Sequence, residues 1–289
     1  MSPRQFDVVI IGAGPAGLAA AAVVAAAGSS CVAIDRMGPG GQLMNLGTLL
    51  GMPDLEPGAM GPDLLASLAE KAMDAGAELA VDDVTRVLTG ESFLVEALDE
   101  TYAATAVVVA TGLTPGTTRV PDERRFEGQG LSHCASCDGP LYQALPVVVA
   151  GDDLWSLTEA IELAATASTV TLVSAGQIEA PPEVLAAWAA LSNVEHVHGR
   201  IVGLEGATAL QSVQVDASGG SRRVPARGLF LYAGREPDLS AIAEVVPLTP
   251  GIFFAGDVRS DRKSNLVEAI ADGSDAGHNA LAHVRARRA

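Results

Sequence analysis

The sequence is poor in aromatic residues, in cations and in cysteine. Phe, Trp and Tyr make up 4% of its 289 residues, so a hydrophobic core has to come mainly from Ala, Val and Leu. Only 18 Lys and Arg stand against 35 Asp and Glu, which gives a formal net charge of −17. This acidity argues against nucleic acids and anionic membrane surfaces as partners, because both repel a negatively charged protein.

Long hydrophobic runs are missing as well. No apolar stretch reaches the ~18 residues that a membrane-spanning helix needs. Gly12, Gly14, Pro15 and Gly17 interrupt the apolar N-terminal stretch, which is not typical of a secretion signal. Three cysteines are too few for a disulfide scaffold, and two of them form a C-x-x-C motif. Without an export signal, this motif indicates redox or metal chemistry in a reducing compartment, so we expect a cytoplasmic protein.

The N-terminal region has the pattern of a dinucleotide-binding unit. Residues 6–11 (FDVVII) predict a buried strand, and residues 12–17 (GAGPAG) form a glycine-rich turn. The Ala-rich run that follows predicts a helix ending at Gly28. A second strand, residues 31–34, leads to Asp35. Strand, turn, helix, strand and acid therefore occur in the order of a Rossmann motif.

Each glycine of this turn has a physical role. Gly12 permits the tight turn, Gly14 lets the backbone approach a pyrophosphate, and Gly17 lets the helix pack closely on the strand. The N–H groups at the helix N-terminus then face the phosphate charge. Asp35 comes about 20 residues after the first glycine, where a carboxylate would hold a ribose hydroxyl.

Three further segments carry a resemblance to a known family. Residues 105–112 (TAVVVATG), 251–257 (GIFFAGD) and 40–42 (GGQ) are similar to the FAD-binding half of the low-molecular-weight thioredoxin reductases. The resemblance implies FAD as cofactor, with the glycine-aspartate turn on the ribityl chain and the GGQ segment against the flavin. It assigns cofactor contacts to Gly12, Gly14, Pro15, Ala16, Gly17, Asp35, Arg36, Gly41, Gln42, Ala110, Thr111, Gly112, Gly256, Asp257 and Asn265.

The C-x-x-C motif, Cys134 to Cys137, has four possible interpretations. A zinc site usually needs a second pair of ligands, and no other C-x-x-C or H-x-x-x-H is present. A structural disulfide is disfavoured in a reducing compartment, and a chance pair is disfavoured by the flanking residues. A redox-active pair fits, because two intervening residues let the sulfurs reach bonding distance. The third cysteine, Cys31, lies in a predicted strand and is expected to be a buried hydrophobic residue.

Residues 126–139 (FEGQGLSHCASCDG) resemble the active-site signature of the thioredoxin reductases. The resemblance implies that Cys137 faces the flavin and that Cys134 attacks the disulfide of the partner. It also implies that Asp138 protonates the leaving thiolate. His133 either lowers the pKa of a thiol or is a solvated bystander.

Reductases of this family insert a second, smaller Rossmann domain that binds NADPH. Residues 146–150 and 169–173 predict its first two strands, and residues 157–165 predict the helix between them. Of the fingerprint glycines only Gly151 remains, because the second is replaced by Asp153, next to Asp152. At about 5 Å and an effective dielectric near 20, each aspartate–phosphate pair costs roughly 3 kcal/mol.

The second half of NADPH recognition is missing too. Ser174 stands where the ribose-binding residue is expected, and the run from Ser174 to Glu179 (SAGQIE) holds no cation for a 2′-phosphate. Glu159-Ala160-Ile161 keeps the helix register without a gap. We therefore predict that NADPH does not bind, the alternative being a divergent site that holds NADPH through other contacts.

Unusual relatives in the superfamily suggest ferredoxin, a second flavin or oxygen as the redox partner instead of NADPH. Ferredoxins are acidic, so docking would need a basic cluster, for which Arg222, Arg223 and Arg227 are the candidates unless they form a solvated edge. Trp155 either stacks on a flavin or fills the vacated space. Small-molecule dithiol oxidases typically carry His after the second cysteine. This chain has Asp138 at that position, which disfavours an oxidase but leaves it as an alternative.

The sequence thus predicts an α/β fold of two Rossmann-like, doubly wound domains. Residues 1–113 and 236–289 would form the FAD domain, and residues 114–235 the inserted domain with the C-x-x-C. The predicted function is a homodimeric, thioredoxin-reductase-like dithiol/disulfide oxidoreductase that does not use NADPH and binds no metal. Its substrate would be a thioredoxin-like protein or a small-molecule disulfide. The alternatives are a conventional NADPH-dependent thioredoxin reductase, a dithiol oxidase and a non-enzymatic flavin-bearing redox sensor.

Overall fold

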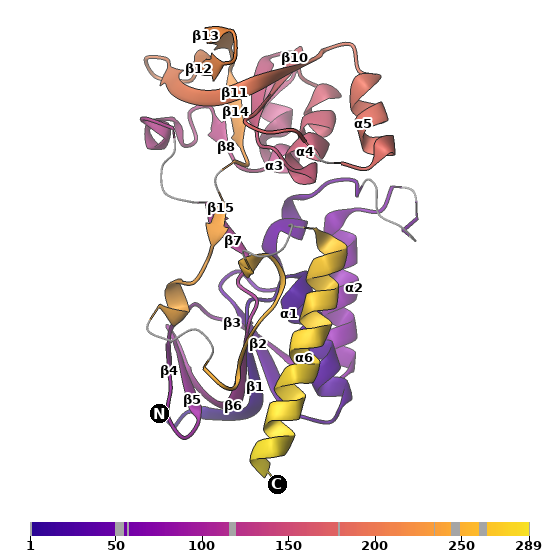
Figure 1. Cartoon of the computed structure of the whole chain (residues 1–289), viewed down its shortest axis with the longest axis vertical. Helices are drawn as coiled ribbons and strands as arrows, with labels where there is room; N and C mark the ends of the chain where they lie inside the picture. The colour runs from indigo at the N-terminus through magenta and orange to yellow at the C-terminus, as the bar shows by residue number, and fades with distance from the viewer. Residues whose placement is uncertain are drawn as a thin grey trace. The chain divides into compact units, whose positions relative to one another are not determined.

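The computed structural model describes residues 2–49, 55–56, 58–115, 120–178, 180–233, 235–243, 249–259 and 265–288. The chain divides into two compact units (Figure 1). Unit 1 comprises Met1–Met44, Pro62–Thr114 and Glu236–Ala289, and unit 2 comprises Asn45–Gly61 and Pro115–Arg235. Both units are α/β, as predicted from the sequence.

Residues 45–61 belong to unit 2, whereas the sequence analysis placed them in the first domain. The Ser136 hydroxyl donates a hydrogen bond to the Asn45 carbonyl, at 3.4 Å. The Glu162 side chain lies directly against Gly47. These contacts join residues far apart in the chain, so no local pattern predicted them.

Unit 1 is built on a seven-stranded sheet of order β3-β2-β1-β6-β5-β4, with β16 also paired to β6. Its parallel strands are β1 (Arg4–Ile11), β2 (Cys31–Asp35), β3 (Glu78–Val81), β6 (Thr101–Val109) and β16 (Ile252–Phe254). The antiparallel strands β4 (Val84–Leu88) and β5 (Phe93–Ala97) complete it. Val8, Val9 and Ile10 of β1 are fully buried, as the apolar run FDVVII predicted.

Helices α1 (Pro15–Ala26) and α6 (Leu266–Arg288) lie side by side in unit 1, and α2 (Gly61–Asp74) is its third helix (Figure 1). The contact between α1 and α6 depends on small residues. A Cβ atom on Gly273 would lie 2.1 Å from the Ala16 carbonyl oxygen, which no real structure tolerates. The Ala-rich composition of α1 therefore serves close helix packing as well as helix propensity.

Unit 2 has a seven-stranded sheet of order β13-β12-β11-β10-β9-β14-β8. The strands are β8 (Leu131–Ser132), β9 (Pro146–Ala150), β10 (Thr169–Ser174), β11 (Val194–Glu205), β12 (Ser212–Ala217), β13 (Gly220–Pro225) and β14 (Gly228–Leu231). Its helices are α3 (Ala135–Asp138), α4 (Leu154–Ala164) and α5 (Pro182–Ala189). The short strands β7 (Leu113–Pro115) and β15 (Arg235–Pro237) pair where the chain passes between the units.

Helix α4 begins at Leu154, three residues before the predicted start at Leu157. The reason is that Asp153 caps the helix and so adds almost one turn. The five 3₁₀ helices of the described residues are η1 (Gly41–Asn45), η2 (Glu123–Phe126), η3 (Gly139–Tyr142), η4 (Ser240–Ile242) and η5 (Gly256–Val258). None of the helices in the described part of the chain is both long and apolar enough to span a membrane.

Candidate active site and cofactor site

The predicted cofactor residues lie at the carboxyl ends of four parallel strands of unit 1. Gly12 follows β1, Asp35 ends β2, Ala110 follows β6, and Gly256 comes shortly after β16. Because β1 pairs with β2 and β6, and β6 pairs with β16, these ends share one edge of the sheet. Ligands of open α/β sheets bind at this edge.

The three glycines of the turn differ in what surrounds them. Gly12 has a φ of +101°, and a Cβ there would meet the Ala110 carbonyl oxygen at 2.3 Å. A Cβ on Gly17 would lie 1.9 Å from the Gly12 carbonyl oxygen. At Gly14 the nearest atom would be the Gly40 carbonyl oxygen, at 3.9 Å. The fold therefore requires glycine at the first and third positions, whereas Gly14 leaves open space, through which a pyrophosphate could approach the backbone.

The N-terminus of α1 is free to bind an anion. Gly14 is the N-cap residue, and no side chain caps the helix. Pro15 occupies the first turn, where its missing N–H costs nothing, and the N–H groups of Ala16 and Gly17 follow. A pyrophosphate fits this arrangement, because free N–H groups and the helix dipole both favour negative charge.

Asp35 is held in place by the backbone around the turn. One carboxylate oxygen accepts a hydrogen bond from the Ala13 N–H at 2.9 Å, and the other accepts from the Met37 N–H at 3.0 Å. A cavity of about 90 Å³ opens beside it, lined among others by Arg36, Thr111 and Asp238. This position suits the ribose and base of an adenine nucleotide.

The remaining predicted cofactor residues have different local contacts. Arg36 approaches Asp238 at 3.8 Å, and the Thr111 hydroxyl donates to the Asp238 carbonyl at 2.6 Å. The backbone of Gly41 packs directly against Gly14. The Asn265 side chain accepts a hydrogen bond from the N–H of Glu268 at 2.8 Å, so it caps α6. Gln42 lies in η1, Gly112 follows β6 together with Ala110, and Asp257 lies with Gly256 in η5.

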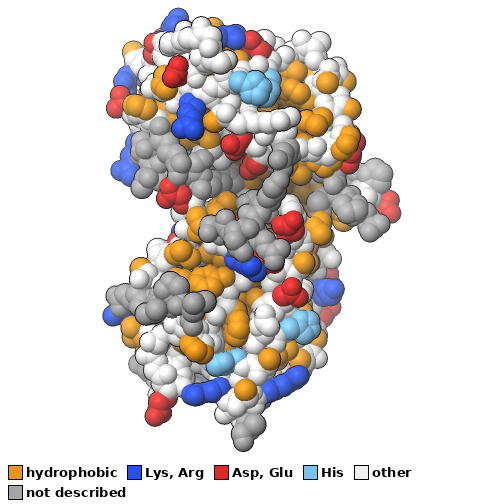
Figure 2. Space-filling model, in the orientation of Figure 1, with side chains coloured by type: hydrophobic (Ala, Val, Ile, Leu, Met, Phe, Trp, Pro, Cys, Tyr) orange, Lys and Arg blue, Asp and Glu red, His pale blue; other side chains and the backbone are white. Residues whose placement is uncertain are grey.

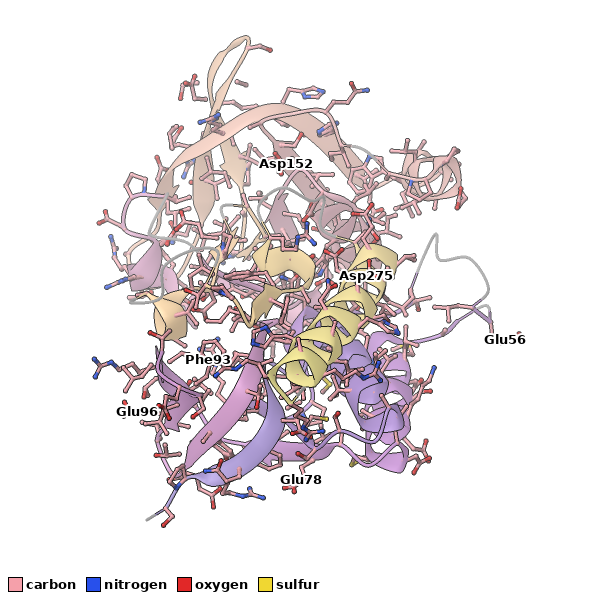
Figure 3. The ribbon with its side chains drawn as sticks, turned by 60° about the horizontal axis from the view of Figure 1, so that its bottom comes forward. Glu56, Glu78, Phe93, Glu96, Asp152 and Asp275 are labelled. Carbon is pink, nitrogen blue, oxygen red and sulfur yellow. A yellow bond between two sulfur atoms is a disulfide. The ribbon has the colours of Figure 1, made fainter. Side chains whose placement is uncertain are left out.

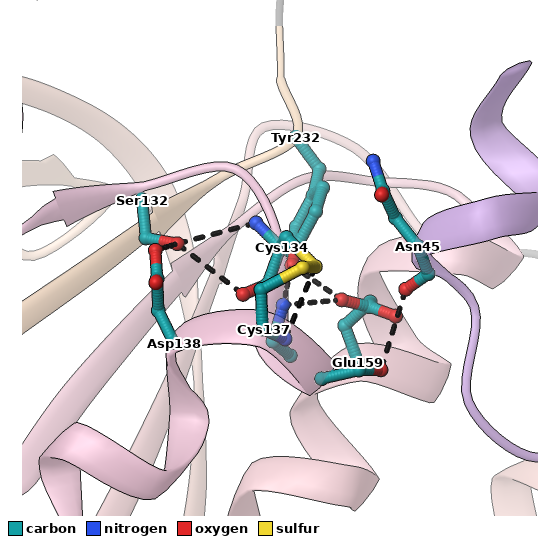
Figure 4. The surroundings of a disulfide bond; sticks show 9 residues. Asn45, Ser132, Cys134, Cys137, Asp138, Glu159 and Tyr232 are labelled. Atoms are coloured by element: carbon teal, nitrogen blue, oxygen red, sulfur yellow. Dashed lines mark hydrogen bonds between the residues drawn. A yellow bond between two sulfur atoms is a disulfide. The ribbon is translucent and has the colours of Figure 1, made fainter. Parts of the chain in front are cut away.

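Cys134 and Cys137 form a disulfide in unit 2 (Figure 4). Cys134 is the N-cap residue of α3, and its sulfur accepts a hydrogen bond from the Cys137 N–H at 3.1 Å. Cys134 is 8% exposed, whereas Cys137 is exposed to solvent. Among the residues that the structure describes, no group of His, Cys, Asp and Glu is arranged to hold a metal ion.

Ser132, which the sequence analysis did not single out, holds the predicted acid. Its hydroxyl donates to the Asp138 carboxylate at 2.7 Å and accepts from the Cys134 N–H at 3.2 Å (Figure 4). The ring nitrogens of His133 instead contact the Leu231 carbonyl and the Glu127 carboxylate, at 3.1 and 3.3 Å. This geometry favours the bystander interpretation of His133.

Known proteins of similar sequence identify the family of this chain. Residues 6–273 match the family of pyridine nucleotide-disulphide oxidoreductases. A thioredoxin reductase of Listeria monocytogenes is 32% identical over 97% of this chain and 94% of its own length. The chain belongs to the thioredoxin reductase family. It is therefore a disulfide oxidoreductase, and its cofactor is FAD, for which the open space at Gly14 and the uncapped α1 are suited.

Other family members agree with this placement. The thioredoxin reductase of Bacillus subtilis is 31% identical over 97% of this chain and 95% of its own length. The crystal structure of the Lactococcus lactis thioredoxin reductase superposes with a TM-score of 0.90 at 26% identity, and the match covers 97% of this chain and 99% of that one.

A buried acid, Glu159 of α4, lies beneath the disulfide of this family member. Its side chain is 0% exposed, and one carboxyl oxygen accepts from the Ala135 N–H at 2.9 Å and from the Tyr232 hydroxyl at 2.5 Å. Burial raises the pKa of Glu159 from 4.5 to about 7, against the lowering effect of these hydrogen bonds. In the sequence Glu159 served only to fix the helix register, and its partners are 24 and 73 residues away in the chain, so no local pattern indicated its contact with the redox motif.

Burial of Glu159 makes the stability of unit 2 dependent on pH. The unfolded carboxyl releases its proton near pH 4.5 and the folded one near 7, so this contribution is full below about 4.5 and declines as pH rises to about 7. Glu159→Gln does not ionise, so it should remove this pH-dependent loss in the free energy of unfolding, which is on the order of 3 kcal/mol above about pH 7. Urea unfolding of the wild type and of Glu159→Gln at about pH 5 and pH 8 measures the difference in the free energy of unfolding. Equal pH dependence in the two proteins would contradict the burial argument.

The third cysteine, Cys31, takes no part in either site. It is 1% exposed in β2, and burial raises the pKa of its thiol to about 12. The prediction that it is a buried hydrophobic residue is confirmed.

Proposed function

We propose that this family member exchanges electron pairs between its Cys134–Cys137 dithiol and the disulfide of a thioredoxin-like protein or small molecule, and that NADPH is not its electron donor. One observation carries the second part: the helix that would receive the NADPH pyrophosphate is capped by the chain's own carboxylate. We further propose a homodimer, as the family resemblance implies, and a cytoplasmic location, as the C-x-x-C motif without a recognisable export signal indicates.

Helices α1 and α4 occupy equivalent places in the two units, and their N-termini differ. At α1 no side chain occupies the cap. At α4 the Asp153 carboxylate accepts from the Ser156 N–H at 2.8 Å, and the Asp153 N–H donates to the Ser156 hydroxyl oxygen at 3.2 Å. A capping box of this kind takes the Ser156 N–H, one of the helix donors that a pyrophosphate would use, and places a carboxylate at the helix N-terminus. The two helices thus provide an internal comparison between an open and a closed anion site.

The loop before α4 adds charge to this closure. Asp152, labelled in Figure 3, is exposed beside Asp153, so two carboxylates stand where phosphates would bind. Gly151 is explained by packing, since a Cβ there would lie 2.4 Å from the Cβ of Ser156. Together the two carboxylates would oppose the cofactor by several kcal/mol, on the order of 3 kcal/mol each.

The ribose side of the vacated site is occupied by internal hydrogen bonds. The Ser174 hydroxyl donates to the Gly176 carbonyl at 2.8 Å and lies 2.8 Å from a ring nitrogen of His196. Burial and the neighbouring His198 lower the pKa of His196, so this ring is neutral at pH 7. Residues 174–178, which the structure describes, supply no Lys or Arg for a 2′-phosphate.

The groups considered for alternative donors are engaged elsewhere. Arg222 pairs with Glu195 at 2.6 Å and Arg223 with Glu205 at 2.7 Å, so two of the three arginines considered for ferredoxin are neutralised. On the face shown in Figure 2, basic side chains are scattered. The ring of Trp155 lies 5.6 Å from that of Tyr232 and packs against the core of unit 2, which favours the space-filling interpretation.

The proposed chemistry uses this chain's own groups. Bound FAD supplies or takes up the electron pair. A thiolate of the reduced pair attacks the partner disulfide, the second cysteine displaces the partner thiolate, and the enzyme disulfide re-forms. Asp138, held by Ser132, is placed to protonate the leaving thiolate.

Turnover distinguishes an enzyme from a redox sensor. Protein reduced with dithionite and freed of excess should convert an added thioredoxin disulfide or small-molecule disulfide to the dithiol and recover its own disulfide. Repeated cycles with fresh dithionite should give product in excess of enzyme. A sensor would give none, and rapid oxygen consumption with a dithiol would favour an oxidase.

The roles of the two cysteines predict different spectra. In a Cys134→Ser variant, Cys137 is left as a lone thiolate, which should give a broad long-wavelength flavin band that titrates with the thiol pKa. A Cys137→Ser variant should lack the band. Because Cys137 is the more exposed residue, the competing assignment has Cys137 attack the partner disulfide and Cys134 face the flavin. A band in Cys137→Ser and not in Cys134→Ser would establish that assignment.

A further inference from the structure

Glu159 touches the redox motif at its centre. Its carboxyl oxygen accepts from the N–H of Ala135, the residue that directly follows Cys134, and from the hydroxyl of Tyr232, which follows β14 (Figure 4). The same Ala135 N–H lies 3.0 Å from the Tyr232 oxygen. A carboxyl, a phenol and the first turn of α3 therefore form one buried cluster under the disulfide.

We propose that Glu159 is a positioning residue that couples a proton to the redox state of the dithiol: while it is ionised, Cys134 keeps its proton after reduction, and while it is protonated, Cys134 ionises readily. This inference rests on the redox role proposed above for Cys134 and Cys137. It adds a residue that no contact with a substrate or cofactor would reveal.

The physical basis is the charge of Glu159 beside the first turn of α3, which begins at Cys134. Thiolates at the start of a helix are stabilised by its free N–H groups, which is a main reason for the reactivity of C-x-x-C motifs. Cys134 is the N-cap residue and already receives the Cys137 N–H. The Ala135 N–H is taken by Glu159. A carboxyl oxygen accepts this N–H whether or not the acid is protonated, so ionisation of Glu159 changes only the charge. An ionised Glu159 places a negative charge near the sulfur, in a buried region where charges interact strongly.

The groups that act on Glu159 come from α3, α4 and the segment after β14. Ala135 of α3 and Tyr232 after β14 donate to its carboxyl oxygen, and Trp155 of α4 also lowers its pKa by hydrogen bonding. On α4 itself, Glu162 adds a smaller repulsion. Burial places the pKa of Glu159 at about 7, so its charge changes in the range where the exchange would operate.

The proton count follows from this coupling. Reduction breaks the S–S bond and adds two electrons. With Glu159 ionised, both sulfurs take up protons and two protons are consumed. With Glu159 protonated, Cys134 remains a thiolate and one proton is consumed. Ionisation of the thiol stabilises the reduced state, so an ionised Glu159 makes the disulfide harder to reduce.

The test is to equilibrate the FAD-loaded protein with dithiothreitol at a series of pH values and to measure the fraction of reduced dithiol. Samples are quenched with acid, the unfolded protein is alkylated, and the reduced and oxidised forms are separated by mass. A Glu159→Gln variant should match the wild type at about pH 5.5 and favour the reduced form by about tenfold at about pH 8, equivalent to ~30 mV. Tyr232→Phe removes a hydrogen-bond donor that lowers the pKa of Glu159, so the pKa of Glu159 should rise in this variant. The pH at which the disulfide becomes harder to reduce than in Glu159→Gln should therefore be higher than in the wild type.

Glu162→Gln is the matched control, because it removes the same charge one turn away on α4. It should change the equilibrium less than about twofold. A Glu159→Gln curve that coincides with the wild type, or a Tyr232→Phe curve that shifts to lower pH, would overturn the inference. If the wild type itself formed no reversible disulfide, the proposed function would fail as well. If the cysteines form a reversible disulfide but Glu159→Gln has no effect on it, only the inference about Glu159 would be overturned.

Discussion

Micromolar NADPH is expected to leave the flavin of this protein oxidised in an anaerobic titration, whereas dithionite bleaches it. The reason is the capped N-terminus of α4, where the Asp153 carboxylate accepts the Ser156 N–H and Asp152 adds a second charge. Each carboxylate opposes a phosphate by roughly 3 kcal/mol, which lowers affinity by about two decades per pair. NADH should fail for the same reason. Rapid reduction of the unmodified protein by NADPH would return it to the conventional reductases.

Restoring the fingerprint should restore binding. The variant combines Asp152→Gly and Asp153→Gly with Ser174→His, Ala175→Arg and Gly176→Arg. Loss of two repulsive charges and gain of two cations should strengthen NADPH binding by several kcal/mol at low salt, less as salt rises. The chain tolerates glycine at the cap at a cost of a few tenths of a kcal/mol. Fluorescence titration with NADPH measures the change.

A matched variant separates charge from bulk. Asp152→Asn with Asp153→Asn removes both charges but keeps a side chain at each position and a good helix cap. If charge dominates, this variant should recover part of the affinity when combined with the three cationic changes. If the glycine variant also fails to bind, Trp155 closes the site, and the missing charges are a consequence rather than the cause.

Purified protein is expected to be yellow with one FAD per chain, and a Gly14→Val variant is expected to be colourless. In the protein alone, a Cβ at Gly14 meets nothing closer than 3.9 Å, so the side chain is compatible with the fold. It would, however, occupy the space through which the pyrophosphate approaches the backbone. Flavin absorbance after purification and circular dichroism together measure this effect.

Two further glycines serve as controls for this experiment. Gly219 lies in the turn between β12 and β13 with no atom within 4 Å of its Cβ position, so Gly219→Val should keep its flavin. Gly17→Val should instead fail to fold, because its Cβ would lie 1.9 Å from the Gly12 carbonyl oxygen. Full flavin occupancy in Gly14→Val would show that the cofactor is bound elsewhere.

The helices, strands and turns that depend on neighbouring residues could be predicted from the sequence alone. The strand, turn and helix of residues 6–28 depend on neighbouring glycines and on a continuous apolar run, and β1, α1 and β2 begin and end within about two residues of their predicted limits. The loss of the glycine at Asp153 was equally visible, since one residue type at one position carries it. Helix ends and turns are short-range structures, which is why a linear pattern is sufficient.

Which groups surround the disulfide depends on packing between segments that are distant in the chain. Tyr232, for example, donates to Glu159 from 73 residues away. Glu159 reads in the sequence as one more acid on an amphipathic helix, yet packing buries it completely and brings it to Ala135. Its raised pKa is a consequence of lost solvation, which depends on every element packed around it. Periodicity predicts which face of an element is apolar, whereas contacts between distant segments arise only when those faces pack together.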